Sequence, residues 1–252
     1  MPLFPRLPSY LSRLFTSRRT KSARSAYDLW AEDYDDQPQN LVLAWDEEIF
    51  SMLLGWTDLE NRVVVDIGCG TGRHWQKILD KNPSRLAGYD VSAGMLKHLI
   101  IKYPQAECRL LSGHQLTELP DASVGCILST LTMAHFKNVE KVLREWTRVL
   151  QPGGSMIITD FHPAALAKGG KRTFRYQKRT IAIRNYLHPI DAIKNLARQL
   201  GLQVLRLVEK PIDESAKHFY EAQNAIEVYE IWKGTPVIYG MLLKKAECSS
   251  VI

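Results

Sequence analysis

The sequence predicts an α/β protein built on a doubly wound, mostly parallel sheet. Short β-branched apolar runs alternate with segments whose apolar residues repeat at helical spacing. Glycines gather directly after the first of these runs, at residues 68–72, and a Pro-Gly-Gly sequence at 152–154 separates a helix pattern from a strand pattern. Strands and helices that alternate in this way are typical of parallel sheets with helices on both faces.

The first half of the chain contains three expected strands. Residues 62–67 (RVVVDI) are a continuous β-branched run, which predicts a fully buried parallel strand. After the glycine turn, Trp75, Ile78 and Leu79 form a helical apolar stripe. We then expect a strand, a helix and another strand at residues 86–89, 93–102 and 108–111.

The second half continues the alternation. We expect its first three elements, which are strand, helix and strand, at residues 124–129, 139–150 and 156–160. A further helix at 188–200 has Pro189 near its first turn and Gly201 after its end. We interpret the two closing strands as a hairpin-like pair with a long connection, at residues 203–208 and 236–243.

The chain of 252 residues is long enough for one large α/β domain and too short for two. We expect a helical N-terminal segment at residues 1–40, with a helix at 10–15 and a lid role, followed by the main domain at 41–252. Inside this domain, residues 161–191 form an insertion after the fifth strand. No apolar run approaches the roughly 18 residues that a membrane helix needs, so we expect no membrane span.

The formal net charge of +6 comes from one end of the chain. Residues 1–27 contain six basic side chains and no acid, and residues 161–190 contain seven and no acid. Both segments are candidate partner surfaces, but we interpret them as solvated faces of a tail and a loop and expect no nucleic-acid partner. The scattered cysteines indicate a reducing, cytoplasmic setting, whereas the Arg- and Ser-rich start leaves an organelle as the alternative.

The main functional signal is the sequence VVVDIGCGTG at residues 63–72. Its glycines permit a tight turn and let a ligand approach backbone N–H groups. Dinucleotide-binding proteins use a related loop, but Asp66, two residues before the first glycine, would repel a pyrophosphate. Gly72 also comes one position too early for that motif. A carboxylate beside the loop instead suits a ligand with ammonium and sulfonium groups, and S-adenosylmethionine (SAM) has both.

A second acid, Asp90, ends the expected second strand 20 residues after Gly70. At this position a carboxylate accepts hydrogen bonds from both hydroxyls of a ribose. The feature fits SAM and NAD equally well. Asp90 is also a candidate N-cap of the following helix, and the two roles are compatible.

Four segments resemble the successive motifs of class I SAM-dependent methyltransferases: DIGCGTG, GYDVSAGML, LPDAS and RVLQPGG. The resemblance covers about residues 27–160 and is strongest to the small-molecule branch (methyltransferase type 11), which includes quinone methyltransferases. It implies a seven-stranded Rossmann-like sheet, SAM as the cofactor and S-adenosylhomocysteine (SAH) as a product. It also implies a small, aromatic or amphipathic acceptor that is methylated at O, N or C.

The N-terminal sequence AYDLWAEDYD matches the paired Tyr-Asp motif of that branch, whose aromatic residues close over the cofactor. Tyr34 is therefore a candidate lid residue near the sulfonium; the alternative is that Tyr27 and Tyr34 belong to the apolar stripe of a packing helix. After the third strand the sequence SGHQ departs from the family pattern, which makes His114 and Gln115 the candidates near the adenine. The cofactor-binding residues that the resemblance implies are Tyr34, Asp66, Gly68, Cys69, Gly70, Gly72, Asp90, Val91, Met95, His114 and Ser129.

Methyl transfer needs a nucleophile in line with the methyl group, and positioning supplies most of the acceleration. The ends of the fourth and fifth strands border the methyl group in such sheets. We select His135 and His162, one from each strand end, as the groups that deprotonate or orient the nucleophile; the alternative is a structural role for both. We expect no metal site. The candidate acceptor contacts are Tyr27, Phe161, Tyr186 and His188, of which His188 fits a cap beside Pro189 slightly better.

The insertion at residues 161–191 is the expected acceptor lid. Because it follows the fifth strand, it lies over the carboxyl edge of the sheet, and we expect only the N-terminus to reach the same place. Its aromatic residues stand among basic ones, which suits a flat acceptor with negative charge. These aromatic residues are Phe161, Phe174, Tyr176 and Tyr186.

Two other functions are open at this point. An RNA methyltransferase is favoured only by the basic segments, and the sequence lacks the Asn-Pro-Pro-Tyr or Asp-Pro-Pro-Tyr loop that stacks a base. A SAM-binding partner subunit that has lost catalysis is disfavoured by the intact glycine loop. Fold alone does not choose between them.

Overall fold

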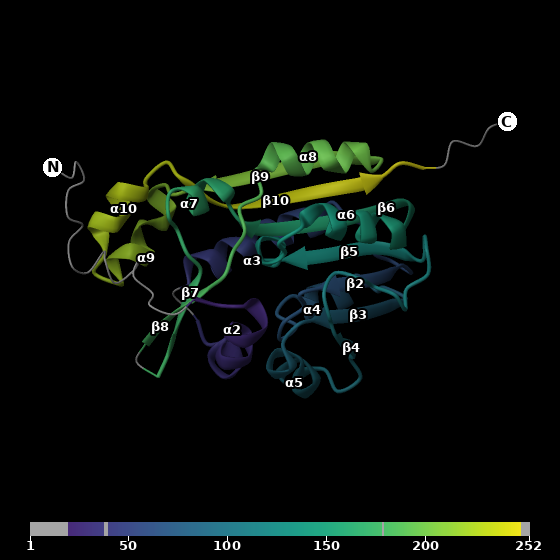
Figure 1. Ribbon diagram of the computed structural model, residues 1–252, viewed down its shortest axis with the longest axis horizontal. Helices are drawn as coiled ribbons and strands as arrows, with labels where there is room; N and C mark the ends of the chain where they lie inside the picture. Colours follow the sequence, from purple (N-terminus) through teal and green to yellow (C-terminus); the bar gives the residue numbers. More distant parts are fainter. Residues whose placement is uncertain (1–19, 38–39, 178, 248–252) are drawn as a thin grey trace.

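The computed structural model describes residues 20–37, 40–177 and 179–247. The helix expected at residues 10–15 lies outside the described residues. Within them, seven strands form one mixed sheet (Figure 1). In order across the sheet these strands are β4 (Glu107–Leu110), β3 (Arg85–Asp90), β2 (Val63–Ile67), β5 (Val124–Thr130), β6 (Leu150–Phe161), β10 (Pro236–Lys245) and β9 (Leu202–Pro211).

The strand directions confirm the predicted fold class. All pairs from β4 to β6 are parallel, whereas β10 runs antiparallel to both of its neighbours, β6 and β9. The prediction of a hairpin-like pair at the end of the chain is therefore confirmed. Its second strand, β10, lies between β6 and β9. The sheet is doubly wound because its order reverses between β2 and β5.

Helices cover both faces of the sheet and enclose two apolar cores (Figure 1). Adjacent residues of a strand point to opposite faces, so Val64 joins one core and Val65 the other. The helices on the first face are α3 (Leu41–Gly55), α4 (Trp75–Leu79) and α5 (Ala93–Lys102). Those on the second face are α6 (Val139–Val149) and α8 (Ile190–Gln199).

Side-chain caps set where several of these helices begin. The amide side chain of Asn40 accepts a hydrogen bond from the backbone N–H of Leu43 at the start of α3, and Ser92 and Asn138 cap α5 and α6 in the same way. α8 begins one residue after Pro189, which occupies the N-cap position rather than the first turn. The helix α6 ends at Val149, as expected, but β6 starts immediately afterwards and runs through the Pro-Gly-Gly sequence.

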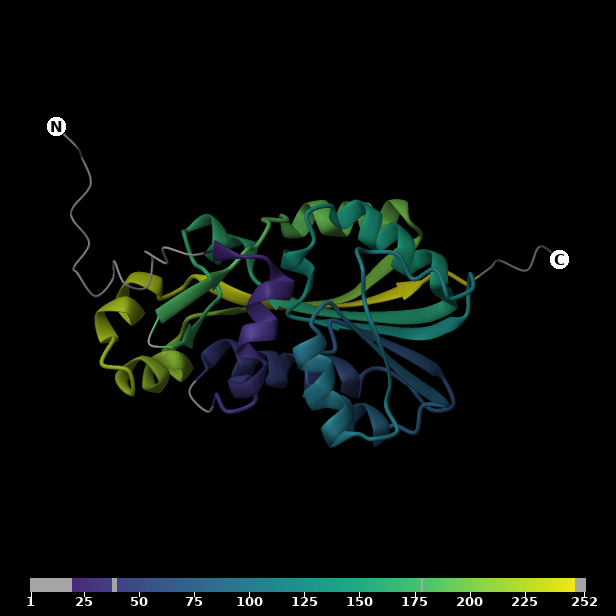
Figure 2. The ribbon, with the colours of Figure 1, turned by 60° about the horizontal axis from the view of Figure 1, so that its bottom comes forward.

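The N-terminal segment and the insertion meet in a second, three-stranded sheet. The insertion contributes α7 (Pro163–Ala167), β7 (Thr173–Tyr176) and β8 (Arg179–Ile183), and β8 pairs in parallel with β1 (Thr20–Lys21). The chain then enters α2 (Ala23–Trp30), followed by the short helix η1 (Ala31–Asp33). Figure 2 shows α2 lying between the insertion and the parallel half of the main sheet. We call this combined unit, residues 20–34 and 163–186, the cap.

A third segment also reaches the carboxyl edge, which corrects the expectation that only the insertion and the N-terminus do so. The connection between β9 and β10 contains η3 (Glu214–Ala216), α9 (Lys217–Glu221) and α10 (Ile226–Trp232). Since β10 is antiparallel to β6, with Ile238 opposite Phe161, this connection lies at the end of β6, beside α7 (Figure 1). The ammonium of Lys168 donates to the carbonyl oxygen of Ile231 at 2.7 Å and joins α7 to α10. Across the described ranges, no helix has the length and apolar character needed to cross a bilayer.

Candidate active site

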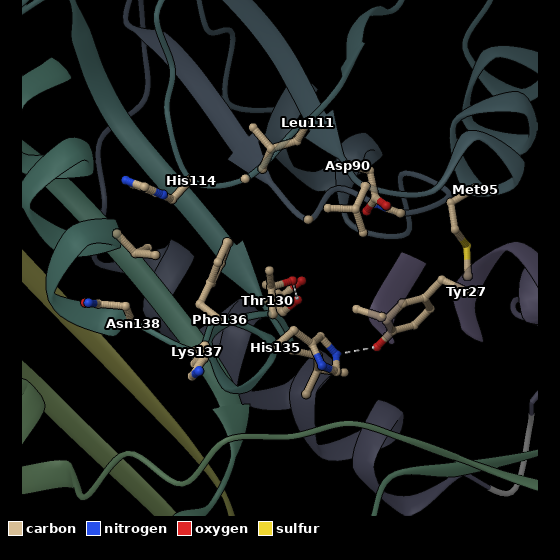
Figure 3. A pocket seen from close by; sticks show the side chains of 18 of the residues that line it. Tyr27, Asp90, Met95, Leu111, His114, Thr130, His135, Phe136, Lys137 and Asn138 are labelled. Atoms are coloured by element: carbon tan, nitrogen blue, oxygen red, sulfur yellow. Dashed lines mark hydrogen bonds between the residues drawn. The ribbon is translucent and has the colours of Figure 1, made fainter. Parts of the chain in front are cut away.

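A cavity of about 450 Å³ opens at the carboxyl ends of β2, β3 and β5, beneath α2 (Figure 3). Ligand pockets for small molecules usually have volumes of roughly 300–1,000 Å³. The walls come from the glycine loop, the segment after β3, the segments after β4 and β5, and the first turn of α6. The location agrees with the rule that open α/β sheets bind ligands where the strand order reverses.

Two glycines of the loop line the cavity, and each has a different reason to be glycine. Gly68 has a φ of 77°, and a Cβ there would lie 2.0 Å from the hydroxyl oxygen of Thr132, so only glycine lets the segment after β5 pass. Gly70 has a φ of 54°, and a Cβ there would meet nothing within 4 Å, because it would project into open space. A ligand can therefore approach the backbone of Gly70 closely.

Gly72 and Cys69 do not line the cavity, although both were expected to contact the cofactor. A Cβ at Gly72 would meet the side chains of Tyr103, Leu99 and Trp75, so this glycine serves helix packing. The thiol of Cys69 is buried against Gly88 on β3. Ser129 is also fully buried in β5 and outside the cavity, whereas its neighbour Thr130 lines it.

Asp90 stands at the centre of the cavity wall, at the end of β3 (Figure 3). Its carboxylate accepts hydrogen bonds from the backbone N–H groups of Gly70, at 2.9 Å, and Ser92, at 2.8 Å. Burial raises the pKa of Asp90 to about 6. A carboxylate has about four lone-pair positions, so the group can still accept a hydrogen bond from a ligand.

Asp66 occupies a different position from the one expected. It is buried in β2, accepts a hydrogen bond from the indole N–H of Trp75 at 2.9 Å, and does not line the cavity. Burial raises its pKa to about 6 as well. The hydrogen bond to Trp75 directs the Asp66 side chain toward α4, so this carboxylate lies behind the loop.

His114 lines one end of the cavity, away from Tyr27 and Met95 (Figure 3), and Val91 and Leu111 add apolar side chains to the lining. The wall that comes from the segment after β5 and the start of α6 (Figure 3) was not predicted from the sequence. Its residues are Phe136, Lys137, Asn138, Lys141 and Val142.

The other end is closed by a hydrogen bond between the cap and the segment after β5. The hydroxyl of Tyr27 lies 2.9 Å from Nε2 of His135 (Figure 3), and Nδ1 of His135 lies 3.2 Å from the carbonyl oxygen of Arg184. A carbonyl only accepts, so Nδ1 carries the proton and Nε2 accepts from Tyr27. Burial, and then the charge of Arg172, lower the pKa of His135 to about 3. The imidazole is therefore neutral at physiological pH.

Aromatic rings surround Arg172 directly behind this end of the cavity. The guanidinium carbon lies 5.5 Å from the ring centre of Tyr27 and 5.7 Å from that of Trp30. Its N–H groups donate to the carbonyl oxygen of Leu131 at 3.0 Å and to the hydroxyl of Tyr34 at 3.4 Å. Tyr27, Tyr34 and Leu131 all line the cavity, so the cation is one layer of side chains away from it. In the sequence Arg172 could not be distinguished from the exposed basic residues around it.

His162 is a correction to the catalytic assignment. Its Nδ1 accepts a hydrogen bond from the backbone N–H of Ala164 at 3.0 Å and caps α7, while Nε2 lies 2.7 Å from a carboxylate oxygen of Glu209. The ring is buried outside the cavity. The contact with Glu209 shows that the His162 side chain points toward β9 and not into the cavity that His135 lines.

The three other expected acceptor contacts of the insertion also lie outside the cavity. Phe161 is buried at the end of β6, opposite Ile238. The backbone N–H of Tyr186 donates to the carbonyl oxygen of Ala134 at 2.7 Å. Nε2 of His188 lies 2.8 Å from the carbonyl oxygen of Phe136. Tyr186 and His188 therefore brace the segment that carries His135, and His188 does so by a hydrogen bond to the backbone.

Asp28 ties α2 to the wall of the cavity. Its carboxylate accepts hydrogen bonds from the hydroxyl of Ser92, at 2.6 Å, and from the backbone N–H of Gly94, at 3.2 Å. The side chain of Arg24, on the same helix, donates to the carbonyl oxygen of Val91. These contacts hold Tyr27 over the cavity, because they fix both ends of the turn on which it lies.

Comparisons with known proteins agree with this geometry. A methyltransferase domain model matches residues 65–158. A methyltransferase-like protein of Schizosaccharomyces pombe is 32% identical over 97 residues, which is 38% of this chain and 37% of that protein. A demethylmenaquinone methyltransferase of Tropheryma whipplei is 26% identical over 61% of this chain and 65% of that enzyme. The chain thus spans about one third to two thirds of the lengths of these relatives.

Solved structures share the fold. A SAM-dependent methyltransferase from Mesorhizobium loti superposes with a TM-score of 0.60 at 17% identity, over 77% of this chain and 96% of that one. A geranyl diphosphate C-methyltransferase from Streptomyces coelicolor, solved with Mg²⁺, geranyl diphosphate and SAH, gives 0.60 at 13% identity over 81% and 77%. The chain therefore shares the fold of SAM-dependent methyltransferases of known structure, and a methyltransferase domain model matches it at residues 65–158.

Proposed function

We propose that the chain binds SAM in the cavity and transfers its methyl group to a small acceptor beneath the cap, with SAH as the second product. The observation that carries the proposal is the pair formed by Asp90 and Gly70. A carboxylate that faces the cavity lies beside a backbone stretch that no Cβ covers. This arrangement suits the two ribose hydroxyls of a nucleoside.

The remaining walls fit the other parts of SAM. Val91, Met95 and Leu111 offer an apolar slot for the adenine ring, and His114 borders it. The glycine loop leads from this slot toward Tyr27, Tyr34 and His135, where the amino-acid part and the reactive methyl group would lie. When bound, SAM supplies an electrophilic methyl carbon on a positively charged sulfur.

The chain's own contribution to catalysis is positioning. The neutral imidazole of His135 accepts a hydrogen bond from Tyr27 at the closed end of the cavity, and burial raises the pKa of Tyr27 well above its usual value. These two side chains would orient an acceptor rather than remove its proton, since a base with a pKa of about 3 takes up protons poorly at neutral pH. Proximity can supply most of the acceleration of a methyl transfer.

The acceptor we propose is a small aromatic or amphipathic molecule of a biosynthetic pathway. Support comes from the apolar cavity and from relatives whose names refer to quinone and isoprenoid substrates. The cap is the proposed acceptor lid, since α2 covers the cavity and the insertion holds α2. We propose a cytoplasmic setting, which fits the free thiols of Cys69, Cys108 and Cys126.

Calorimetry with SAM, SAH and NADH tests the proposal. We expect SAM and SAH to bind in the micromolar range, an order of magnitude typical of metabolic cofactors, and NADH not to bind. SAH release in the presence of candidate quinols, phenols and isoprenoids then identifies the acceptor. Binding of NADH without binding of SAM would show that the assignment of the cavity is wrong.

A further inference from the structure

Arg172 is a buried cation without a carboxylate partner in the part of the chain that the structure describes. Its side chain is 7% exposed. A guanidinium has five N–H donors, and this one donates two hydrogen bonds, to the carbonyl oxygen of Leu131 and the hydroxyl oxygen of Tyr34, both of which are uncharged. The faces of Tyr27 and Trp30 stabilise it further, by cation–π contacts.

Few other charges lie near this cation. Asp160, at the end of β6, accepts hydrogen bonds from the backbone N–H groups of Ala134 and Phe161, and burial raises its pKa to about 6. Asp46 is more distant and is occupied by Arg73 and His74. His135 is neutral. Asp160 and Asp46 attract Arg172 electrostatically, but neither forms a direct ion pair with it in the part of the chain that the structure describes. A buried cation without a direct ion pair destabilises a fold, so its presence beside a cavity indicates a second role.

Building on the function proposed above, we propose that Arg172 determines acceptor specificity by selecting an acceptor bound as an oxyanion, of the phenol or enol class. The cation lies one layer behind Tyr27, Tyr34 and Leu131, at the end of the cavity where the acceptor would lie. Burial in this region raises the pKa of a phenol such as Tyr27, and the charge of Arg172 opposes that effect. Compared with an uncharged side chain in its place, Arg172 therefore favours the anionic form of an acidic hydroxyl, whose proton leaves to bulk water. A protonated amine is disfavoured by the same charge.

The test measures binding of two dyes of matched shape to the SAH complex of the full chain. 4-Nitrophenol can ionise and changes colour when it does, whereas 4-nitroaniline has nearly the same shape and stays neutral. We expect the complex to bind 4-nitrophenolate about tenfold more tightly than 4-nitroaniline, and the apparent pKa of the bound phenol to be about one unit lower in the wild-type complex than in R172Q. Equal binding of the two dyes by the wild-type complex overturns the proposal.

Variants assign the effect to Arg172. R172Q should abolish the preference for nitrophenolate, whereas R172K, which retains the charge, should keep most of it. The matched control is R175Q, since Arg175 is an exposed arginine of the same insertion and should behave as wild type. An R172Q variant that folds and keeps the preference contradicts the proposal. If R172Q does not fold, R172K and R175Q provide the test. The proposal is also contradicted if R172K loses the preference for nitrophenolate while R175Q keeps that preference.

A second comparison separates the acceptor from the carboxylate of the cofactor, which is the other anion that could reach Arg172. Calorimetry with SAH and with 5′-methylthioadenosine, which lacks the amino-acid part, distinguishes them. We expect R172Q to change the affinity for both ligands by less than about threefold. A selective loss of SAH affinity assigns Arg172 to the cofactor and overturns the inference about the acceptor. Failure of the wild-type chain to bind SAH would instead contradict the proposed function.

Discussion

The backbone N–H of Gly70 donates a hydrogen bond to the carboxylate of Asp90, on the neighbouring strand, at 2.9 Å. The same carboxylate faces the cavity, so it holds the glycine loop in place and presents acceptor positions to a ligand. One side chain thus links the shape of the loop to ligand binding.

Replacing Asp90 should weaken SAH binding strongly. Asp90→Ala removes the acceptor for two ribose hydroxyls, and hydrogen bonds to a charged group contribute about 1.5–3 kcal/mol each, so we expect a loss of affinity of about 100-fold or more. Asp90→Asn keeps one acceptor oxygen and should lose about tenfold. Isothermal titration calorimetry measures both. Wild-type affinity in Asp90→Ala would show that the ribose lies elsewhere.

SAH binding should also depend on pH through Asp90. Burial raises the pKa of this carboxyl to about 6, so the ionised form that accepts both hydroxyl protons is present above about pH 7 and is lost as the pH falls through 6. We expect the dissociation constant to be constant above pH 7 and to rise below pH 6. Asp90→Asn should bind weakly with a flat profile. A profile that stays steep in this variant would assign the titration to another group.

Asp66→Asn should stabilise the protein at neutral pH without weakening SAH binding. Asp66 is buried, and its pKa of about 6 lies above the usual value of 3.8, so its ionised form destabilises the fold above pH 6. The amide can still accept from the indole of Trp75. We expect up to about 2 kcal/mol at pH 7.5 and no difference near pH 4, where the native carboxyl is protonated. Urea unfolding at the two pH values measures the effect, and a large loss of SAH affinity would place Asp66 in the site.

The two histidines should respond differently to alanine. His135 lines the cavity, so His135→Ala should lower turnover of the identified acceptor by about tenfold or more while SAH affinity stays nearly unchanged. His162 caps α7 and contacts Glu209, so His162→Ala should lower the free energy of unfolding by about 1 kcal/mol and leave turnover intact. Turnover assays and thermal unfolding distinguish these outcomes. A loss of turnover in a folded His162→Ala variant would restore it as a catalytic candidate.

Release of α2 should weaken SAH binding. Asp28→Ala removes hydrogen bonds from Ser92 and Gly94, so α2 should open more often, and we expect a loss of affinity of about tenfold and faster hydrogen exchange at residues 23–30. Glu32→Ala is the control, because Glu32 is exposed and, within the described residues, its carboxylate pairs with Nε2 of His98 at 3.5 Å. Equal effects of the two variants would show that α2 does not respond to the Asp28 contacts.

The sequence predicted the main sheet well because local patterns determine its elements. A β-branched run, a glycine turn and a helical stripe occupy residues 63–79, and the helix expected at 93–102 has the same bounds as α5. The start of β6 differed, because β6 pairs with β5 through the Pro-Gly-Gly sequence with a shift in register. Such pairing depends on a strand that lies more than 20 residues away, which a local pattern does not contain.

The site was predicted in part, for a related reason. Residues that end strands, such as Asp90, project to the carboxyl edge, and strand positions can be read from the sequence. The cap could not be placed in this way, since Tyr27 meets His135 and Arg172 only through long-range packing. His162 lies outside the cavity, which the sequence could not show because a histidine at a strand end can turn to either side. Only the neighbouring Glu209 on β9 shows which side it takes.

The pairing of Thr20 with Ala182 has a consequence for how the chain folds. The two residues are separated by roughly 160 positions, and closing so long a loop is slow and entropically costly. During synthesis, β2 to β6 emerge before β8 does, so these five strands of the sheet can assemble before β1 has β8 to pair with. The pairing of β1 with β8 is therefore a late event in folding. We expect it to open more readily than the main sheet does.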